Sequence, residues 1–428
     1  MLKRLVRSKI FINSQAYIGG TFLTSLIPFI LLPILTRYLS PADYALVAMF
    51  QILSSILYPV ISLSIHGAIT VKYFDTERIN LPNYIGNCLL IVCFNTIVTS
   101  LLFYCCAGTI SQISVFPKNW LWSPLLFAFA QSLVMLVLTV WLVQSKAITH
   151  TIYQVLLSLS NVAFSIFLVV MLQRKWQGRI EAQLITTIIF ACVALIYLQR
   201  KRFLDFHYNP GYIKSALRYG IPLIPHELGA LLMIFVDRFF LMNMRGASDT
   251  GIYTVGYQVG SIVGVVALSF NKAYIPWLFE KIKQNNFLVK LKVVKYTYCY
   301  FIAVIIASIA YSYIASWALP FIVGKDFKDA GSYILWFALS GAFMGMYYMV
   351  SNYLLFAEKT YLLAAATFVI ALINALLTYV LIRINGTLGA AQSALITNCL
   401  YFTLVWYLSS RSYTMPWGLH KTPPKVSL

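Results

Sequence analysis

Charged side chains are scarce in this sequence: 32 Lys and Arg and 12 Asp and Glu make up only 10% of its 428 residues. A soluble domain carries about 25% charged residues, because polar groups must cover its surface. With 60% hydrophobic residues, this chain has too few polar groups for such a surface. The composition therefore excludes a soluble protein and indicates that lipid surrounds most of the chain.

Acidic residues are the scarcest charged class, which leaves a formal net charge of +20. In a soluble protein, such an excess would indicate binding to nucleic acid. Here the basic residues lie in short loops between apolar runs, which is the distribution that the positive-inside rule describes for membrane proteins. The excess therefore reflects orientation in a membrane, and no nucleic-acid partner is expected.

Motifs of enzymes are also lacking. The sequence contains no Walker A motif, no GxSxG, no HExxH and no acidic DxD motif, and its seven cysteines form no CxxC pair and have no His at ligand spacing. The cysteines are therefore interpreted as small apolar residues rather than disulfides or metal ligands. We expect no catalytic residues and no metal. Any uphill transport must then use an ion gradient, the membrane potential or mass action on the substrate.

Long apolar runs fill most of the sequence. About 12 of them reach the length of about 20 residues that a helix needs to cross a bilayer. They lie near residues 16–38, 44–69, 84–108, 121–143, 152–172, 180–198, 219–241, 251–270, 296–319, 331–355, 361–382 and 388–408. Backbone groups in lipid must form hydrogen bonds within their own segment, so each run is a helix. The sequence predicts an all-α integral membrane protein with about 12 transmembrane helices.

The two halves of the chain are alike. The longest polar connection, residues 200–218, separates the first six predicted spans from the last six, and around the start of each half Arg37 corresponds to Arg238 and Tyr44 to Tyr253. An even number of crossings gives both halves one orientation, so a pseudo-twofold axis along the membrane normal should relate them. We predict two parallel six-helix lobes. They are residues 1–199 and 219–410, joined by a cytoplasmic segment at 200–218 and followed by a cytoplasmic tail at 411–428.

The distribution of basic residues predicts the orientation. If the N-terminus is cytoplasmic, 22 of the 32 Lys and Arg residues lie on the cytoplasmic side and nine on the opposite side. One, Arg238, lies within a span. This bias predicts that both termini are cytoplasmic. The loop at residues 173–179, with three basic residues on the outer side, runs against the rule.

Ionisable residues inside the spans are few, and each costs about 2.5–3.5 kcal/mol at the centre of the bilayer. Apart from other residues at span ends, all lie on predicted spans 1, 2, 7 and 8, with Arg37 closing span 1 and Lys272 closing span 8. They are Arg37, His66, His226, Glu227, Asp237, Arg238 and Lys272. These spans lead the two halves, so we expect the side chains around one central cavity, with Arg37 and Arg238 near its outer mouth and Lys272 and Arg218 near its inner one. Alternatively, the basic side chains extend to lipid headgroups from the helix ends, and the others make polar contacts between helices.

Two stretches of the sequence suggest a family. Residues 29–52, "FILLPILTRYLSPADYALVAMFQI", and residues 220–263, which begin "GIPLIPHELGALLMIFVDRFFL" and end "GIYTVGYQVGSIV", are similar to the openings of the two lobes in MOP-superfamily exporters. They resemble most the polysaccharide biosynthesis branch, the O-antigen flippases of Wzx type.

The resemblance implies a flippase of the bacterial inner membrane that moves undecaprenyl-diphosphate-linked oligosaccharide, an O-antigen repeat unit or a similar surface glycan, to the outer leaflet by alternating access. It implies a cationic cavity for the diphosphate. The matching candidates are Arg37, Arg238, Lys272, Arg218 and His66. Glu227, Asp237 and His226 either bind a coupling H⁺ or Na⁺ or pair with the arginines. No other cofactor is implied, and the expected partners are membrane lipids and other polysaccharide assembly proteins.

Two alternatives remain open at this point. A drug/cation antiporter of the same superfamily would have the same spans but an anionic cavity, whereas basic residues outnumber acidic ones among the candidates. A membrane-embedded polysaccharide polymerase or ligase would act on glycan outside the cell and usually displays a sizeable outer loop, whereas every outer loop expected here is short.

Overall fold

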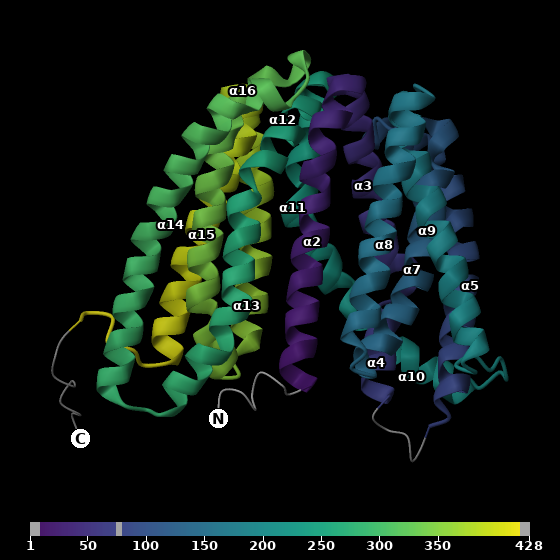
Figure 1. Ribbon diagram of the computed structural model, residues 1–428, viewed down its shortest axis with the longest axis horizontal. Helices are drawn as coiled ribbons and strands as arrows, with labels where there is room; N and C mark the ends of the chain where they lie inside the picture. The colour runs from purple at the N-terminus through teal and green to yellow at the C-terminus, as the bar shows by residue number, and fades with distance from the viewer. Residues whose placement is uncertain (1–8, 74–78, 420–428) are drawn as a thin grey trace. The chain divides into compact units, whose positions relative to one another are not determined.

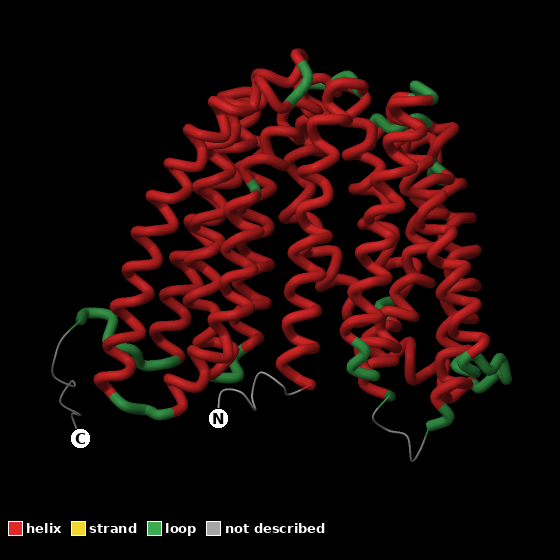
Figure 2. Tube along the Cα trace, viewed as in Figure 1, coloured by secondary structure: helices red, strands yellow, loops and turns green. Residues whose placement is uncertain are grey.

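The computed structural model describes residues 9–73 and 79–419, and every regular element within them is a helix (Figure 2). The predicted all-α class is therefore confirmed. Nine helices in these residues are long and apolar enough to cross a membrane. The arrangement of about 12 crossings in two lobes stays a prediction.

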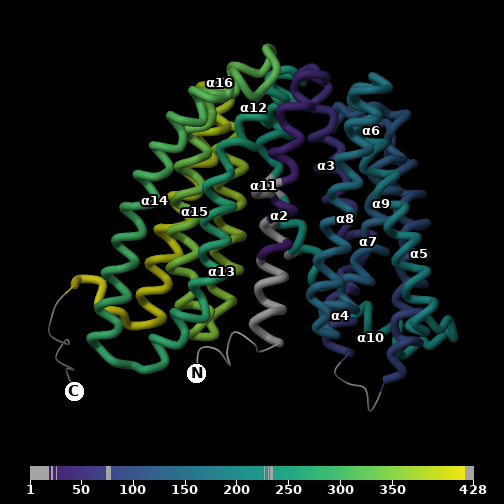
Figure 3. Tube along the Cα trace, in the orientation of Figure 1, coloured from purple at the N-terminus to yellow at the C-terminus, as the bar shows by residue number. Residues whose placement is uncertain are grey.

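The chain divides into two compact units, Met1–Gly251 and Ile252–Leu428. We call them the N-terminal and C-terminal units and follow their helices by colour in Figures 1 and 3. Up to α11 the elements are α2 (Lys9–Tyr38), α3 (Pro41–Ser62), α4 (Ile65–Lys72), α5 (Leu81–Cys105), α6 (Ala107–Ser114), η1 (Lys118–Trp120), α7 (Trp122–Val143), α8 (Ala147–Ser165), the π-helix η2 (Ile166–Met171), α9 (Lys175–Arg200), α10 (Pro210–Gly220), η3 (Ile221–Leu223) and α11 (Ile224–Met244). From α12 onward they are α12 (Ala247–Gly260), α13 (Ile262–Lys283), α14 (Phe287–Ile322), η4 (Lys325–Ala330), α15 (Gly331–Phe356) and α16 (Thr360–Ser412).

The N-terminal unit extends past the predicted joint at residues 200–218. Helix α10 packs against α4 and α5, and α11 packs against α3. These contacts bring the start of the second sequence half into the first compact unit. The compact units are defined by contacts, whereas the two lobes were inferred from the internal repeat of the sequence. The division into lobes therefore stays a prediction.

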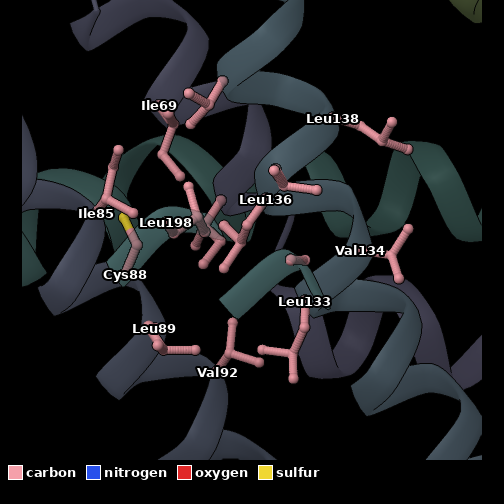
Figure 4. Packing of buried hydrophobic residues seen from close by; sticks show 14 of the residues in the cluster. Ile69, Ile85, Cys88, Leu89, Val92, Leu133, Val134, Leu136, Leu138 and Leu198 are labelled. Carbon is pink, nitrogen blue, oxygen red and sulfur yellow. The ribbon is translucent and has the colours of Figure 1, made fainter. Parts of the chain in front are cut away.

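A continuous apolar core holds the N-terminal unit together. Ile69 of α4, Ile85 of α5, Leu136 of α7 and Leu198 of α9 are all at most 1% exposed and belong to one buried cluster (Figure 4). Helices that share such a close-packed core have fixed relative positions. The polar groups at their ends are therefore held in fixed positions as well.

In the C-terminal unit, α14 and α15 pack against each other, and α15 packs against α16. Helix α16 contains two helical arms, because Gly386 lies between them with φ 62° and ψ −143°. The arms then run side by side, with the hydroxyls of Thr378 and Ser393 2.8 Å apart. Only glycine adopts such a conformation readily. The turn lies between the predicted spans 361–382 and 388–408.

Candidate functional site

The second predicted span is a broken helix. Helix α3 ends at Ser62, and Leu63 and Ser64 take left-handed φ values of 47° and 49° before α4 begins at Ile65. A break frees backbone carbonyls that must find donors inside lipid. The side-chain amide of Asn95 on α5 donates to the carbonyls of Val60 and Ile61 at 2.6 and 3.1 Å. The break is therefore a stabilised feature of the fold, and the continuous helix expected over residues 44–69 is wrong at this point.

An acidic side chain meets this break. The Ser64 hydroxyl donates to Glu227 Oε1 at 2.7 Å, and Glu227 lies in the first turn of α11. The short helix η3 and Pro225 precede it, so α11 is separated from α10 by a second interruption. The contact therefore joins two interrupted helices that are far apart in the sequence.

His66 lies one half-turn beyond Ser64. Its Nδ1 is buried and has no hydrogen-bond partner among the described residues. Its ring centroid is 6.4 Å from that of Tyr58, and the Glu227 carboxylate acts electrostatically on both side chains. We call Tyr58, Ser64, His66 and Glu227 the polar cluster. The predicted residues His66 and Glu227 are brought together here, whereas Ser64 and Tyr58 have no charge or motif that would have revealed them.

This cluster has the groups needed to take up a proton. A carboxylate held by a hydroxyl and influenced by a nearby imidazole can accept a proton, and the open Nδ1 of His66 supplies a further acceptor or donor. His226 lies beside Glu227 in the sequence of α11, but the placement of its side chain lies outside what the structure describes. Its role stays a prediction.

Asp237 and Arg238 form an ion pair with each other. Arg238 Nη1 is 3.2 Å from Asp237 Oδ1, the same oxygen accepts the backbone N–H of Arg238 at 2.7 Å, and the residues are 8% and 4% exposed. The pairing supports the alternative in which an acidic residue neutralises an arginine. Arg37, in the last turn of α2, is exposed. A joint role of these arginines in binding substrate stays a prediction.

The two remaining basic candidates lie in different units. Arg218, on α10, lines a pocket of about 450 Å³ in the N-terminal unit together with Lys72 and Lys214. Lys272, on α13 of the C-terminal unit, is exposed and follows Asn271, whose side-chain oxygen accepts a 2.8 Å hydrogen bond from Asn352. Arg218 therefore has basic neighbours that the sequence analysis did not assign to a site.

Arg179 is a half-buried basic group that the sequence analysis placed in an outer loop. Helix α9 begins at Lys175, so Arg179 is helical, and its Nη1 donates to Asn161 Oδ1 at 2.7 Å and to Ser165 Oγ at 2.6 Å. Both acceptors lie on α8 just before the π-helix η2. Arg179 is therefore a structural link between α8 and α9, which accounts for one of the three basic residues in the exceptional loop.

Comparison with known proteins gives a family match over more than half of the chain and two relatives from one organism. Residues 11–281 match the family described as "Polysaccharide biosynthesis protein". Over 405 residues, the chain is 27% identical to "Lsg locus putative protein 1" of Haemophilus influenzae, covering 92% of this chain and 98% of that protein. An "Uncharacterized membrane protein" of the same organism is 28% identical over 365 residues, with 81% and 84% covered.

Solved structures show the same fold at low identity. The "Lipid II flippase MurJ, inward closed conformation" has a TM-score of 0.74 at 12% identity, with 93% of this chain and 87% of that chain covered. An inward-facing "multidrug resistance MATE family transporter of the MOP superfamily" has a TM-score of 0.68 at 12% identity, with 93% and 94% covered. Together with the nine apolar helices of the described residues, these likenesses show a multi-pass membrane protein with the MOP transporter fold.

Proposed function

We propose that this chain, which belongs to the polysaccharide biosynthesis protein family, is a flippase for a lipid-linked oligosaccharide. Its substrate is an undecaprenyl-diphosphate-linked O-antigen repeat unit or a similar surface-glycan unit. It moves this unit from the cytoplasmic to the outer leaflet of the bacterial inner membrane by alternating access. Family and fold are those of transporters rather than enzymes. The identity of the substrate, a lipid-linked glycan, goes beyond them and is our proposal.

The observation that carries the proposal is the contact between Ser64 and Glu227 at two helix interruptions. Alternating access requires elements that move relative to one another within one fold. Broken helices supply such elements, because few backbone hydrogen bonds resist bending at the break. A protonatable group lies at this junction, which supports transport coupled to an ion.

The chemistry of the contact suggests how coupling works. An ionised Glu227 accepts the hydroxyl hydrogen of Ser64, and a proton on the carboxyl group weakens this charge-assisted bond. Proton uptake then loosens α11 from the break between α3 and α4. His66 beside the carboxylate favours H⁺ over Na⁺ as the coupling ion, because an imidazole exchanges protons near neutral pH and binds alkali cations poorly.

The charge balance supports an anionic substrate. A diphosphate that leaves water needs several N–H donors and compensating positive charge. Arg37, Arg238, Lys272, Arg218 and His66 are our candidates to supply them. The ion pair with Asp237 reduces the positive charge that Arg238 can offer to the diphosphate. We therefore expect Arg238 to act when the substrate displaces Asp237 from part of the guanidinium group.

Deletion of the chain in its native host, followed by analysis of surface glycan and lipid-linked intermediates, tests the function. We expect surface glycan to be lost and complete single units to accumulate on the inner leaflet. Single units that reach the outer leaflet unpolymerised would instead indicate a polymerase or ligase. Unchanged glycan with altered drug tolerance would indicate a multidrug antiporter instead. The structural similarity to a MATE transporter supports this alternative.

The orientation is part of the proposal and has its own test. The excess of basic residues in alternate loops supports cytoplasmic termini. Reporter fusions at the C-terminus and after Gly386, the turn inside α16, should report opposite sides of the inner membrane. Fusions that report the same side would contradict the predicted topology without bearing on the substrate.

A further inference from the structure

A basic pocket lies between α4, α5 and α10 of the N-terminal unit. Its volume is about 450 Å³, and the described residues that line it are Ala68, Val71, Lys72, Tyr84, Gly211, Lys214, Ser215, Arg218 and Tyr219. We call it the α10 pocket. None of these residues is acidic, and three are basic.

The pocket follows from helix periodicity. Gly211, Lys214 and Arg218 recur along α10 at intervals of three and four residues, so they lie on one face of that helix. All three residues are exposed, whereas Ala216 and Gly220 of the same helix are buried, so the basic face is the open face of α10. Helix α10 itself is packed against α4, where a Cβ added to Gly67 would lie 2.8 Å from the ring of Tyr219. The basic side chains are therefore accessible to a ligand while the helix that carries them is held in place.

The start of α10 is fixed in place by α5. The Asn209 side chain caps α10 by accepting from the backbone N–H groups of Gly211 and Tyr212. Asn87 accepts the backbone N–H of Asn209 at 2.9 Å and donates to the carbonyl of His207, also at 2.9 Å. The polar face of α10 is thus preformed, which reduces the ordering that a ligand would have to impose.

Positive charge gathers in the pocket without a carboxylate among its described lining. Lys214 and Arg218 are one helical turn apart on α10. Like charges at this spacing repel one another. An anion between them would relieve the repulsion, and the planar guanidinium of Arg218 is suited to two oxygens of a phosphate group.

Tyr84 places a hydroxyl group at the wall of the pocket. It is 1% exposed, and its hydroxyl interacts with the side chain of Ser215, another residue of the lining. Its ring packs edge-on against that of Tyr212 at 5.4 Å, and the Tyr212 hydroxyl accepts the backbone N–H of Asn80 at 3.1 Å. The ring is therefore held at the pocket. One hydrogen bond between two hydroxyl groups leaves one O–H of the pair free, so Tyr84 and Ser215 together can donate to an anion in the pocket.

We propose that the α10 pocket binds a phosphate oxyanion, as a phosphate monoester, diester or diphosphate. Lys214 and Arg218 supply charge, and Tyr84 and Ser215 supply hydroxyl donors. The volume of about 450 Å³ admits a phosphate or diphosphate group with its bound water. The ligand is either the headgroup of a membrane lipid or a free phosphate compound. Arg218 is also among our candidates for the diphosphate of the transported unit, so this site extends the proposed function, although it requires neither the polar cluster nor the C-terminal unit.

Binding of inorganic diphosphate to the full chain tests the site. The protein is purified in dodecyl maltoside, a detergent without phosphate, and the affinity is measured by calorimetry. We expect the double variant Lys214→Gln/Arg218→Gln to bind at least about tenfold more weakly, because it loses two charge-assisted contacts. The matched control is Lys292→Gln/Lys295→Gln, which removes two exposed lysines from α14. No binding by the wild type, or equal loss in both variants, would overturn the proposal.

The Tyr84→Phe variant distinguishes a binding site that uses this hydroxyl from a surface that attracts anions by charge alone. It keeps the packed ring and removes one oxygen. We expect about tenfold weaker diphosphate binding, the usual effect of one hydrogen bond to a charged group, with only a small loss of thermal stability in the ligand-free protein. An unchanged affinity would overturn the assignment of the Tyr84 hydroxyl to the ligand and with it the built site.

Competition identifies the source of the phosphate. Phosphatidylglycerol is titrated into the same micelles with diphosphate bound. Displacement that disappears in Lys214→Gln/Arg218→Gln would assign the site to a lipid headgroup, whereas undisturbed diphosphate would assign it to free phosphate compounds. Flipping of lipid-linked glycan is measured separately in cells, so a failed flippase assay does not affect these results.

Discussion

The hydroxyl of Ser64 donates a 2.7 Å hydrogen bond to the carboxylate of Glu227, 163 residues further along the chain. Ser64 lies in a left-handed break between two helices, and Glu227 lies in the first turn after another interruption. A single proton on Glu227 therefore weakens a hydrogen bond at a place where both chain segments can bend.

We expect Glu227→Gln to fold normally and to lose the dependence of transport on an imposed pH gradient. Gln retains an oxygen that can accept from Ser64, but it cannot exchange a proton. Transport is measured as the exposure of lipid-linked glycan in vesicles with and without a pH gradient. Glu280→Gln is the control, because that side chain is 70% exposed and lies near the end of α13. Gradient-dependent transport by Glu227→Gln would contradict a coupling role.

Ser64→Ala removes the hydrogen bond to Glu227 but keeps the carboxyl group that can take up a proton, so it distinguishes the effects of the two. It leaves an ionised Glu227 with one donor fewer in a partly buried place, which costs about 1–3 kcal/mol. We expect lower thermal stability and slower transport, with the dependence on the pH gradient retained. Loss of that dependence in Ser64→Ala would mean that the contact itself, rather than the carboxyl proton, determines coupling.

The sequence predicted the helical membrane fold well, because long apolar runs in lipid have few other solutions. It did not predict the break at Leu63 and Ser64, since neither residue is a glycine or proline that would indicate left-handed backbone. Asn95 stabilises the break by a hydrogen bond from another helix, α5. A contact between residues so far apart in the chain produces no pattern in the sequence around the break. His66 and Glu227 were singled out because ionisable residues are scarce within the spans, but their contact with each other was not predicted.

The α10 pocket shows a different limit of sequence analysis. Arg218 was identified as basic and near a span, but Lys72 and Tyr84 become its neighbours only through the packing of α4 and α5 against α10. Arg179 was taken for a loop residue because basic residues cluster around it. Its acceptors on α8 are an amide and a hydroxyl, which sequence alone does not distinguish from ordinary residues of a helix.

We expect Gly220→Ala to destabilise the protein by about 1–3 kcal/mol, the usual cost of overpacking. A Cβ at residue 220 would lie 1.9 Å from the carbonyl oxygen of Leu63, a backbone atom that cannot rotate away. The substitution thus forces α10 away from the helix break. Thermal unfolding in detergent measures the change.

Gly108→Ala is the matched control for this substitution. No atom lies within 4 Å of a Cβ added at Gly108, near the start of α6. We expect its stability to stay within about 0.5 kcal/mol of the wild type. Equal effects of the two substitutions would show that the close approach of Gly220 to Leu63 does not limit stability.

The loop before α10 should give the protein a small dependence of stability on acid pH. The hydrogen bond from the His207 side chain, followed in importance by the His207 backbone N–H and charge, holds the pKa of Asp205 below its ordinary value. The folded state then favours the ionised form. The stabilisation is present above the ordinary Asp pKa of about 3.9 and is lost as pH falls through the lower pKa of the folded state.

We therefore expect Asp205→Asn to lower the unfolding temperature slightly at about pH 7, with the difference vanishing at about pH 2. The effect is small because the carboxyl group is partly exposed and water screens it. Asp326→Asn, at an exposed position in η4, is the control. A difference between the wild type and Asp205→Asn that grows as the pH falls would contradict the assigned direction.

Arg179 and Asn161 should be energetically coupled. Arg179 Nη1 reaches Asn161 from α9 at 2.7 Å, so removal of either side chain leaves the other with one hydrogen bond fewer in a partly buried place. We expect Arg179→Met and Asn161→Leu each to cost about 1–3 kcal/mol of stability. The double variant should cost less than their sum by about 0.5–3 kcal/mol.

Arg174 provides the comparison on the same helix, because its Nη1 pairs with Glu181 at 2.8 Å while its side chain is 53% exposed. Solvent screens such a pair, so we expect Arg174→Met to cost at most about 1 kcal/mol. The four unfolding measurements of the Arg179–Asn161 cycle then isolate the buried contact from the general effect of removing an arginine. Additive losses in that cycle would show that α8 and α9 are held together by apolar packing alone, and that Arg179 has another task in the N-terminal unit.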